Sequence, residues 1–275
     1  MSQEKANLVS TSDEVSRLYD RFAAQCAASM FGDSMSLHLG YRDDPDSEVS
    51  FSEAADRLTD LMTEKLKIGS GSHVLDVGCG VGGPGVRIAR LTGARVTGIS
   101  VSQEQIAVAN SLAESAGLAE RVVFQQANAM EMLFPAQSFD AAIALESLPH
   151  MPDRGQVLTQ IGRALRPGGR LVLTDLFERA PIPAAKQPAV DRLLNNFMST
   201  LVRAEDYPPL LRHAGLWFEE ILDISEQTLP TSYVWLQSEL ETIMFGDEVT
   251  GRFDGIDVII PEVGYLMVVA KRPKR

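Results

Sequence analysis

The feature that most constrains the fold is an alternation of short apolar runs with helical stretches between residues 69 and 181. Helical segments separate five such runs: HVLDVG, RVTGIS, RVVFQQA, FDAAIALES and GRLVLTDLF. This order is typical of βαβ units, in which a parallel sheet carries helices on both faces. The runs are apolar almost without interruption, as expected for strands that are buried on both sides. The sequence therefore predicts an α/β fold.

The regions on either side of this alternation have different patterns. Residues 1–67 contain helical patterns, one of which opens with Ser52 as its expected N-cap. Residues 181–205 and 229–260 are predicted to form helices that cover the strand ends, and the runs WFEEILDIS and EVGYLMVVAKRP two further strands. We therefore expect an N-terminal helical cap or lid, followed by one sheet-bearing domain over residues 68–275 that carries the two cover insertions.

Charge and composition exclude several classes of protein. The formal net charge of the 275-residue chain is −12, so no global positive field attracts nucleic acid or an anionic membrane. Cys26 and Cys79 form neither a C-x-x-C motif nor a disulfide framework, and Cys79 is expected to be a small space-filling residue. The start shows no signal-peptide pattern, and no run approaches the roughly 18 apolar residues of a membrane span. We expect a cytoplasmic protein.

The stretch VLDVGCGVGGPG contains a G-x-G-x-x-G at Gly78, Gly80 and Gly83, a spacing found in dinucleotide-binding turns. A nicotinamide site also needs an acid about 20 residues further on to bind the ribose, and this chain has GISVS there. Asp76 precedes the first glycine, where a plain dinucleotide strand seldom carries an acid. A nicotinamide-dependent oxidoreductase is therefore disfavoured, although it remains an alternative from another class of enzyme.

The same stretch resembles the first motif, D/E-x-G-x-G-x-G, of class I S-adenosylmethionine-dependent methyltransferases, with Asp76, Gly78, Gly80 and Gly82 in register. Later segments match that family in order, up to ALRPGGRLVLTD, so the resemblance spans residues 74–175. With YDRF, HLGY and HMPDR included, the chain is most similar to small-molecule methyltransferases of natural-product biosynthesis, namely rebeccamycin-type sugar O-methyltransferases and sterol or tocopherol C-methyltransferases. This resemblance implies a Rossmann-like seven-stranded sheet with N-terminal and cover helices, and S-adenosylmethionine as cofactor.

The resemblance also implies which residues bind the cofactor. Asp76 and the glycines would hold its methionine end, while Ser100 and Gln105 replace the usual ribose-binding acid. Asn128 stands where many relatives have an Asp, and its amide oxygen would accept the adenine amino group. Tyr19 would reach the cofactor carboxylate, although its helical spacing also permits a core role. The full predicted set is Tyr19, Asp76, Gly78, Gly80, Gly82, Ser100, Gln105, Asn128, Ala129 and Met130.

Three residues after the fourth and fifth predicted strands are candidates for catalysis. Methyl transfer from a sulfonium is an in-line displacement that needs a base only if the acceptor must lose a proton. His150 has a near-neutral intrinsic pKa and would take that proton, with Asp175 orienting it, unless it is a structural loop histidine. If an alkene is methylated, Glu146 or Asp175 would stabilise the carbocation or accept a proton.

The wording around His150 bears on the acceptor. Sugar O-methyltransferases of the type that this chain resembles often read SLHHMPDR, whereas this chain reads SLPHMPDR, with Pro149 in place of the first histidine. The missing base favours C-methylation of an alkene or prenyl group in a small hydrophobic natural product. O-methylation of a sugar or phenol hydroxyl, with His150 as base, is the alternative.

The sequence also bears on partners. Aromatic residues and methionines in the predicted cover helices suit a bulky apolar acceptor, although many of them would be core. The N-terminal helices would close over the site and offer a surface for a homo-oligomer. No paired acids or histidines near the site show the spacing of metal ligands, so no metal is expected. A non-catalytic binding protein on the same fold is a third class, which the intact glycine turn argues against.

Overall fold

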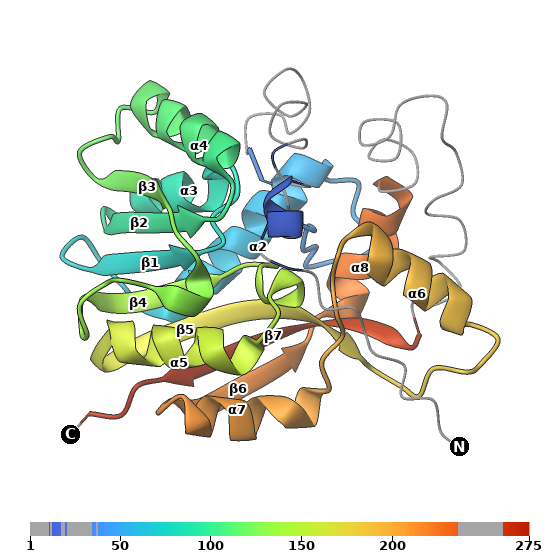
Figure 1. Cartoon of the computed structure of the whole chain (residues 1–275). Helices are drawn as coiled ribbons and strands as arrows, with labels where there is room; N and C mark the ends of the chain where they lie inside the picture. Colours follow the sequence, from blue (N-terminus) through green and yellow to red (C-terminus); the bar gives the residue numbers. More distant parts are fainter. Residues whose placement is uncertain are drawn as a thin grey trace.

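The structure is a computed structural model that describes residues 11, 13–17, 20, 35–36, 38–235 and 261–274. A seven-stranded sheet with the order β3-β2-β1-β4-β5-β7-β6 forms its centre (Figure 1). The strands are β1 His73–Val77, β2 Arg95–Ser100, β3 Val122–Gln126, β4 Phe139–Ala144, β5 Leu165–Glu178, β6 Trp217–Asp223 and β7 Val263–Lys271. The first five are parallel, whereas β7 is antiparallel to both of its neighbours. The predicted α/β fold is confirmed, with a mixed sheet.

Helices cover both faces of this sheet because successive strand residues point to opposite sides. In β1, Val74 joins a core with α2, α3, α4, α6 and α8, whereas Leu75 joins a second core with α5 and α7. The helices are α2 Phe51–Leu66, α3 Gly83–Thr92, α4 Gln103–Ser115, α5 Arg154–Ala164, α6 Gln187–Asn196, α7 Tyr207–His213 and α8 Ser225–Trp235. The apolar runs of the sequence are thus divided between two buried layers.

The N-cap of α2 is Ser50, so the prediction of Ser52 was wrong. The Ser50 side chain accepts a hydrogen bond from the Glu53 backbone N–H, and the Glu53 carboxylate accepts one from the Ser50 N–H. This reciprocal capping box needs a Glu or Gln three residues after the cap. Ser50 has Glu53 at that spacing, whereas Ser52 has Ala55. The competing serine therefore lies inside the helix.

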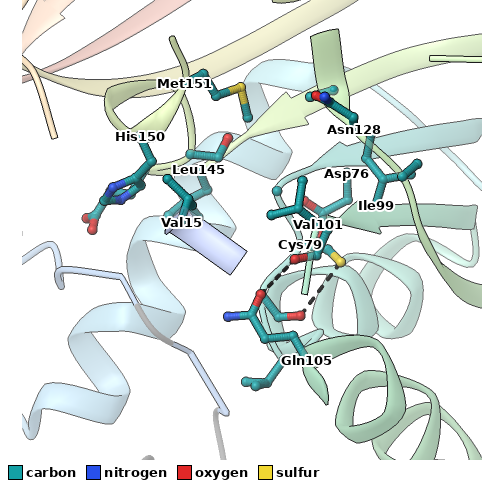
Figure 2. A pocket seen from close by; sticks show the side chains of 18 of the residues that line it. Val15, Asp76, Cys79, Ile99, Val101, Gln105, Asn128, Leu145, His150 and Met151 are labelled. Carbon is teal, nitrogen blue, oxygen red and sulfur yellow. Dashed lines mark hydrogen bonds between the residues drawn. The ribbon is translucent and has the colours of Figure 1, made fainter. Parts of the chain in front are cut away.

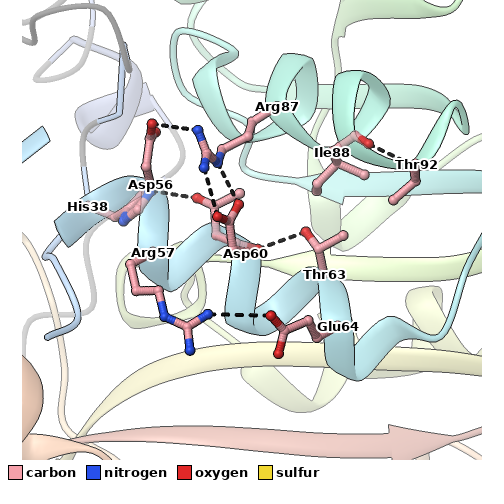
Figure 3. Close-up of polar contacts among 10 residues, drawn as sticks. His38, Asp56, Arg57, Asp60, Thr63, Glu64, Arg87, Ile88 and Thr92 are labelled. Carbon is pink, nitrogen blue, oxygen red and sulfur yellow. Dashed lines mark hydrogen bonds and ion pairs between the residues drawn. The ribbon is translucent and has the colours of Figure 1, made fainter. Parts of the chain in front are cut away.

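Helix α2 is joined to the rest of the molecule by charged and apolar contacts. Arg87 of α3 binds Asp56 and Asp60, with 2.7 Å between Arg87 Nη2 and Asp60 Oδ2 (Figure 3). On the opposite side, Leu58 and Met62 are fully buried in the core that contains α3. Helix α2 therefore packs as a core element of the sheet domain, and a domain boundary near residue 67 stays a prediction.

The predicted cover regions are described in part. Helix α6 lies within the first region, and α8 occupies the start of the second, while residues 236–260 lie outside the described residues. The two late strands form as predicted, as β6 and β7. Among the described residues, no helix combines the length and apolar character needed to cross a membrane. In the same part of the chain, no group of three acidic, histidine or cysteine side chains could hold a metal ion.

Candidate active site

A cavity opens at the carboxyl ends of β1, β2 and β4 (Figure 2). The β1–α3 turn, the β2–α4 turn and the segments that follow β3 and β4 supply most of its wall. Val15, Met35 and His38 complete the wall from the N-terminal part of the chain. Strand order reverses between β1 and β4, and open parallel sheets bind their ligands at such a switch point.

The glycine turn after β1 has a backbone that side chains would not tolerate. Gly78 has φ +79°, and a Cβ atom there would lie 2.2 Å from the Cβ of Ser147. Gly78 and Gly80 both line the cavity, as predicted. Gly82 has φ +91° and faces Ala109 instead, so it packs the turn against α4 and is not part of the wall. Gly78 thus packs against Ser147 and also lines the cavity, whereas Gly82 serves only to pack the turn.

Asp76, near the end of β1, brings an unpaired acid to the cavity. Its side chain is buried, and Oδ2 has no hydrogen-bond partner among the described residues. Burial raises the pKa of this carboxyl to about 7, because the charged form loses its hydration. An unpaired buried carboxylate is destabilising on its own, and a cation that enters the cavity would relieve that cost. The position fits the predicted binding of the cofactor's methionine end.

Ser100 and Gln105 form a neutral polar pair at the end of β2. Ser100 Oγ donates to Gln105 Oε1 at 2.7 Å, and both side chains are buried and line the cavity. Gln105 Nε2 has no partner among the described residues, so this donor is available to a ligand oxygen. The pair predicted from the sequence is therefore brought together in a geometry suited to a ribose hydroxyl.

The segment after β3 lines the same cavity with Asn128, Ala129 and Met130, the three residues predicted to surround adenine. Asn128 Oδ1 accepts a hydrogen bond from the Met130 backbone N–H at 3.0 Å. The amide oxygen that was expected to bind the adenine amino group thus already caps a short 3-10 turn. Tyr19 lies outside the described residues, while Val15 of the same predicted helix lines the cavity.

Glu146 follows β4 in the left-handed backbone region, with φ 51°. Its Oε1 accepts the Leu39 backbone N–H at 2.7 Å and the Tyr265 hydroxyl at 2.5 Å. The Tyr265 oxygen also lies 2.9 Å from Thr174 Oγ1. Burial raises the pKa of Glu146 to about 7, and these two donors act in the opposite direction. The carboxylate therefore ties the segment that contains Leu39 to the sheet at the edge of the cavity.

Two histidines line the cavity, and burial lowers the pKa of each to about 4. His150 follows β4 and lines the same cavity as Gln105, from which it lies apart in the view of Figure 2. His38 bonds through Nδ1 to the Leu39 carbonyl at 2.9 Å and through Nε2 to Thr59 Oγ1 at 3.2 Å. Both rings are neutral near pH 7. Both ring nitrogens of His38 have hydrogen-bond partners within the protein, which indicates a structural role.

Asp175 does not line the cavity, and the predicted pairing of this residue with His150 is not formed. Its fully buried carboxylate binds Arg154 through two hydrogen bonds of 2.7 and 3.0 Å. The Tyr207 hydroxyl donates to the same carboxylate at 2.5 Å. Strand alternation explains the outcome, because the neighbouring Thr174 points toward Glu146 and Asp175 therefore points to the opposite face. These contacts indicate a structural role for Asp175.

Two polar residues of this region, His38 and Tyr265, were not foreseen as part of the site. His38 lies in the HLGY stretch, which the sequence singled out only as a closing segment. Tyr265 lies in β7, where nearly every residue is buried. Nothing in the local sequence distinguishes it from its neighbours or indicates its bond to Glu146. Their roles depend on contacts between residues that are far apart in the sequence.

The donor set in the cavity fits S-adenosylmethionine. A carboxylate oxygen without a partner, at Asp76, suits the cofactor's cationic end, and the unpartnered amide of Gln105 suits a ribose oxygen. Gly78 lines the same cavity, and its φ of +79° is a conformation that favours a residue without a side chain, so the ligand would meet backbone at this point of the wall. These three features are formed by strand ends and turns of one sheet.

The sheet order and the acid before the glycine turn are those of a class I S-adenosylmethionine-dependent methyltransferase. A family model described as a methyltransferase domain matches residues 68–215, and the chain belongs to this family. Its relatives include the methyltransferase GfsG of Streptomyces halstedii, with 38% identity over 95% of each chain. The 27-O-demethylrifamycin SV methyltransferase of Amycolatopsis mediterranei (strain S699) is also 38% identical, over 96% of this chain and 98% of that one. The chain is therefore a methyltransferase of the natural-product type.

Solved structures agree with the fold. The [4+2]-cyclase SpnF is 31% identical and superposes with a TM-score of 0.81, over 97% of this chain and 98% of that one. The geranyl diphosphate C-methyltransferase of Streptomyces coelicolor A3(2) has a TM-score of 0.78 over 98% and 100% of the two chains. At 20% identity, this second likeness is one of fold alone.

Proposed function

We propose that this methyltransferase acts on a hydroxyl oxygen of a bulky, largely apolar natural product, with His150 as the proton acceptor. The observation that carries the proposal is the position of His150, in the wall of the same cavity as Asp76 and Gln105. Because burial keeps the imidazole neutral near pH 7, it is in the protonation state that a base requires.

The chain's residues divide the work of the reaction between binding and proton transfer. S-adenosylmethionine supplies a methyl group activated by its sulfonium centre. Asp76 would hold the methionine end of this cofactor and Gln105 its ribose, in the same cavity whose wall contains the segment after β4. His150 accepts the hydroxyl proton as the acceptor oxygen becomes electron-poor, which strengthens the nucleophile when it is needed. Val15 and Met35 add apolar wall and exclude water from the cavity.

The choice of oxygen over carbon departs from the preference that the sequence suggested. A relative that is 38% identical over almost its whole length is named for methylation of an oxygen. The C-methyltransferase structure is only 20% identical. Carbon methylation stays the second candidate because Pro149 removes one potential base and Glu146 sits in the cavity wall as an alternative proton acceptor.

The test begins with isotope transfer. Purified protein, methyl-deuterated S-adenosylmethionine and a panel of macrocyclic, terpenoid, phenolic and glycosylated alcohols would be incubated, and labelled products located by mass spectrometry and NMR. Label in a methoxy group is the expected result. Label bound to carbon would overturn the proposal and support the second candidate.

Variants then test His150 on the labelled acceptor. His150→Gln should lower kcat by about 100-fold or more, the usual size of a general-base contribution, without weakening S-adenosylhomocysteine binding. His213→Gln is the matched control, because His213 is exposed in the last turn of α7. Pro149→His in the His150→Gln background should restore part of the rate. Unchanged kcat in His150→Gln would remove the base from the proposal.

A further inference from the structure

The ribose end of the cavity depends on a chain of hydrogen bonds that begins outside it. The first bond holds the amide of Gln105, whose Oε1 accepts from Ser100 Oγ at 2.7 Å. Ser100 Oγ itself accepts the backbone N–H of Ser102 at 3.2 Å, so its proton is directed to the amide oxygen. This bond turns the NH₂ group of Gln105 away from Ser100, and its Nε2 has no partner among the described residues.

Ser102 is the next member of the chain and the N-cap of α4. Its Oγ accepts the Gln105 backbone N–H at 3.1 Å, and it donates to Asp20 Oδ1 at 2.5 Å. A serine hydroxyl has one proton, so the bond to Asp20 leaves a lone pair of Ser102 for the Gln105 N–H. Asp20 therefore acts on both the backbone and the side-chain environment of Gln105 through one residue.

The N-terminal helical segment meets this loop at further points. Ser16 Oγ donates to the Val101 carbonyl at 3.3 Å, and the buried side chain of Val15 lines the cavity with Val101 and Gln105. Asp20 thus belongs to a segment that is docked on the β2–α4 turn. A hydrogen bond to a charged acceptor is stronger than one to a neutral acceptor, so Asp20 is well suited to anchor this docking.

We propose that Asp20 is a positioning residue for the cofactor, which orients Gln105 toward the ribose through Ser102. In many class I relatives an acid at the end of the second strand binds the ribose, whereas this chain has the neutral Ser100 at that place. In this chain the negative charge is that of Asp20 in the N-terminal segment, and it acts on Gln105 through Ser102. Docking of that segment and binding of the cofactor are then coupled, so each favours the other.

The test is calorimetry of S-adenosylhomocysteine binding to the full chain, which needs no acceptor and is independent of the proposed function. Asp20→Ala should raise Kd about 10-fold, as expected for loss of a hydrogen bond to a charged group. Asp13→Ala is the matched control, because Asp13 is an exposed acid in the same helical segment, and it should leave Kd unchanged. Asp20→Asn keeps an acceptor oxygen but loses the charge, so it should recover only part of the affinity.

A double-mutant cycle separates positioning from a general effect on the segment. In a Gln105→Ala background, Asp20→Ala should have little further effect on Kd, because both changes remove the same ribose contact. In the unmodified chain, S-adenosylhomocysteine should also slow hydrogen exchange of the peptide that carries Val15 and Asp20. Additive losses in the cycle, or equal Kd values for the Asp20 and Asp13 variants, would overturn the proposal. Circular dichroism of each variant would confirm that it folds.

Discussion

The two ends of the cavity are built in different ways. At the end that we propose for the cofactor, Asp76, Gly78, Ser100 and Gln105 come from two consecutive strand ends and the turns that follow them. At the end that we propose for the acceptor, around Glu146 and His150, Glu146 contacts Leu39 and Tyr265, which are 107 and 119 residues away in the sequence. The cofactor end is therefore formed by residues that are close in the sequence. The acceptor end depends on contacts between residues that are far apart in the sequence.

The two ends also differ in how their buried acids are satisfied. Asp76 has an oxygen without a partner among the described residues, and only burial acts on its pKa. Glu146 receives two donors on one oxygen, which oppose the effect of burial. The first acid is the one that we propose for a cationic ligand, while the second already binds groups of the protein's own chain.

The largest loss of stability is expected at Arg154, whose guanidinium forms an ion pair with the fully buried carboxylate of Asp175. Arg154→Ala should destabilise the fold by about 3–5 kcal/mol, because an uncompensated charge is left in the interior. Urea unfolding measures this difference. Arg203→Ala is the control, because its ion pair with Glu205 is exposed and should contribute less than about 1 kcal/mol.

Asp175→Asn tests whether Asp175 has a structural or a catalytic role. If Asp175 is structural, the variant loses stability but retains kcat for each folded molecule. A loss of kcat of about 100-fold at full occupancy with cofactor, in a variant whose fold is intact, would return Asp175 to catalysis.

The second prediction concerns Gly78 at the cofactor end. Gly78→Ala should abolish measurable S-adenosylhomocysteine binding and destabilise the fold by about 2–4 kcal/mol, because a Cβ at φ +79° would overlap that of Ser147. Gly71→Ala is the matched control, since no atom lies within 4 Å of a Cβ placed there. Calorimetry and thermal unfolding of both variants measure the difference. Retained binding in the Gly78 variant would show that this turn is more adaptable than its geometry indicates.

The contrast between the two ends also decides what could be predicted from the sequence. The strands, the glycine turn and the Ser100–Gln105 pair follow from local patterns, since each lies within a few residues of a strand end. The expected contact of His150 with Asp175 is not formed, because strand alternation places the Asp175 side chain on the face of the sheet where it binds Arg154. No local pattern reports the bond of Tyr265 to Glu146, because it joins the ends of two strands across the sheet. Contacts between distant residues are what the sequence leaves open.

A third prediction separates binding from stability at Asp76. Asp76→Asn should weaken S-adenosylhomocysteine binding by about 10- to 100-fold, through loss of a charged partner for the ligand's cationic end. The free protein should be no less stable, because the carboxylate that is removed has an oxygen without a partner among the described residues. Calorimetry and thermal unfolding without ligand measure the two quantities. A loss of stability with unchanged affinity would instead make Asp76 a structural residue.

The smallest predicted effect is a difference in stability between two pH values, and it depends on the charge of Glu146. The pKa of Glu146 is raised to about 7, so folding favours its protonated form, and the resulting stability is lost as pH rises from the unfolded value toward 7. The Tyr265 hydroxyl opposes this loss by bonding the charged form. Tyr265→Phe should therefore cost about 1 kcal/mol at pH 5 and about 2 kcal/mol at pH 8, because a hydrogen bond to a charged acceptor is the stronger one. Urea unfolding at both pH values, with Tyr41→Phe as control, measures this difference, and an equal cost at both would mean that Glu146 does not change charge between them.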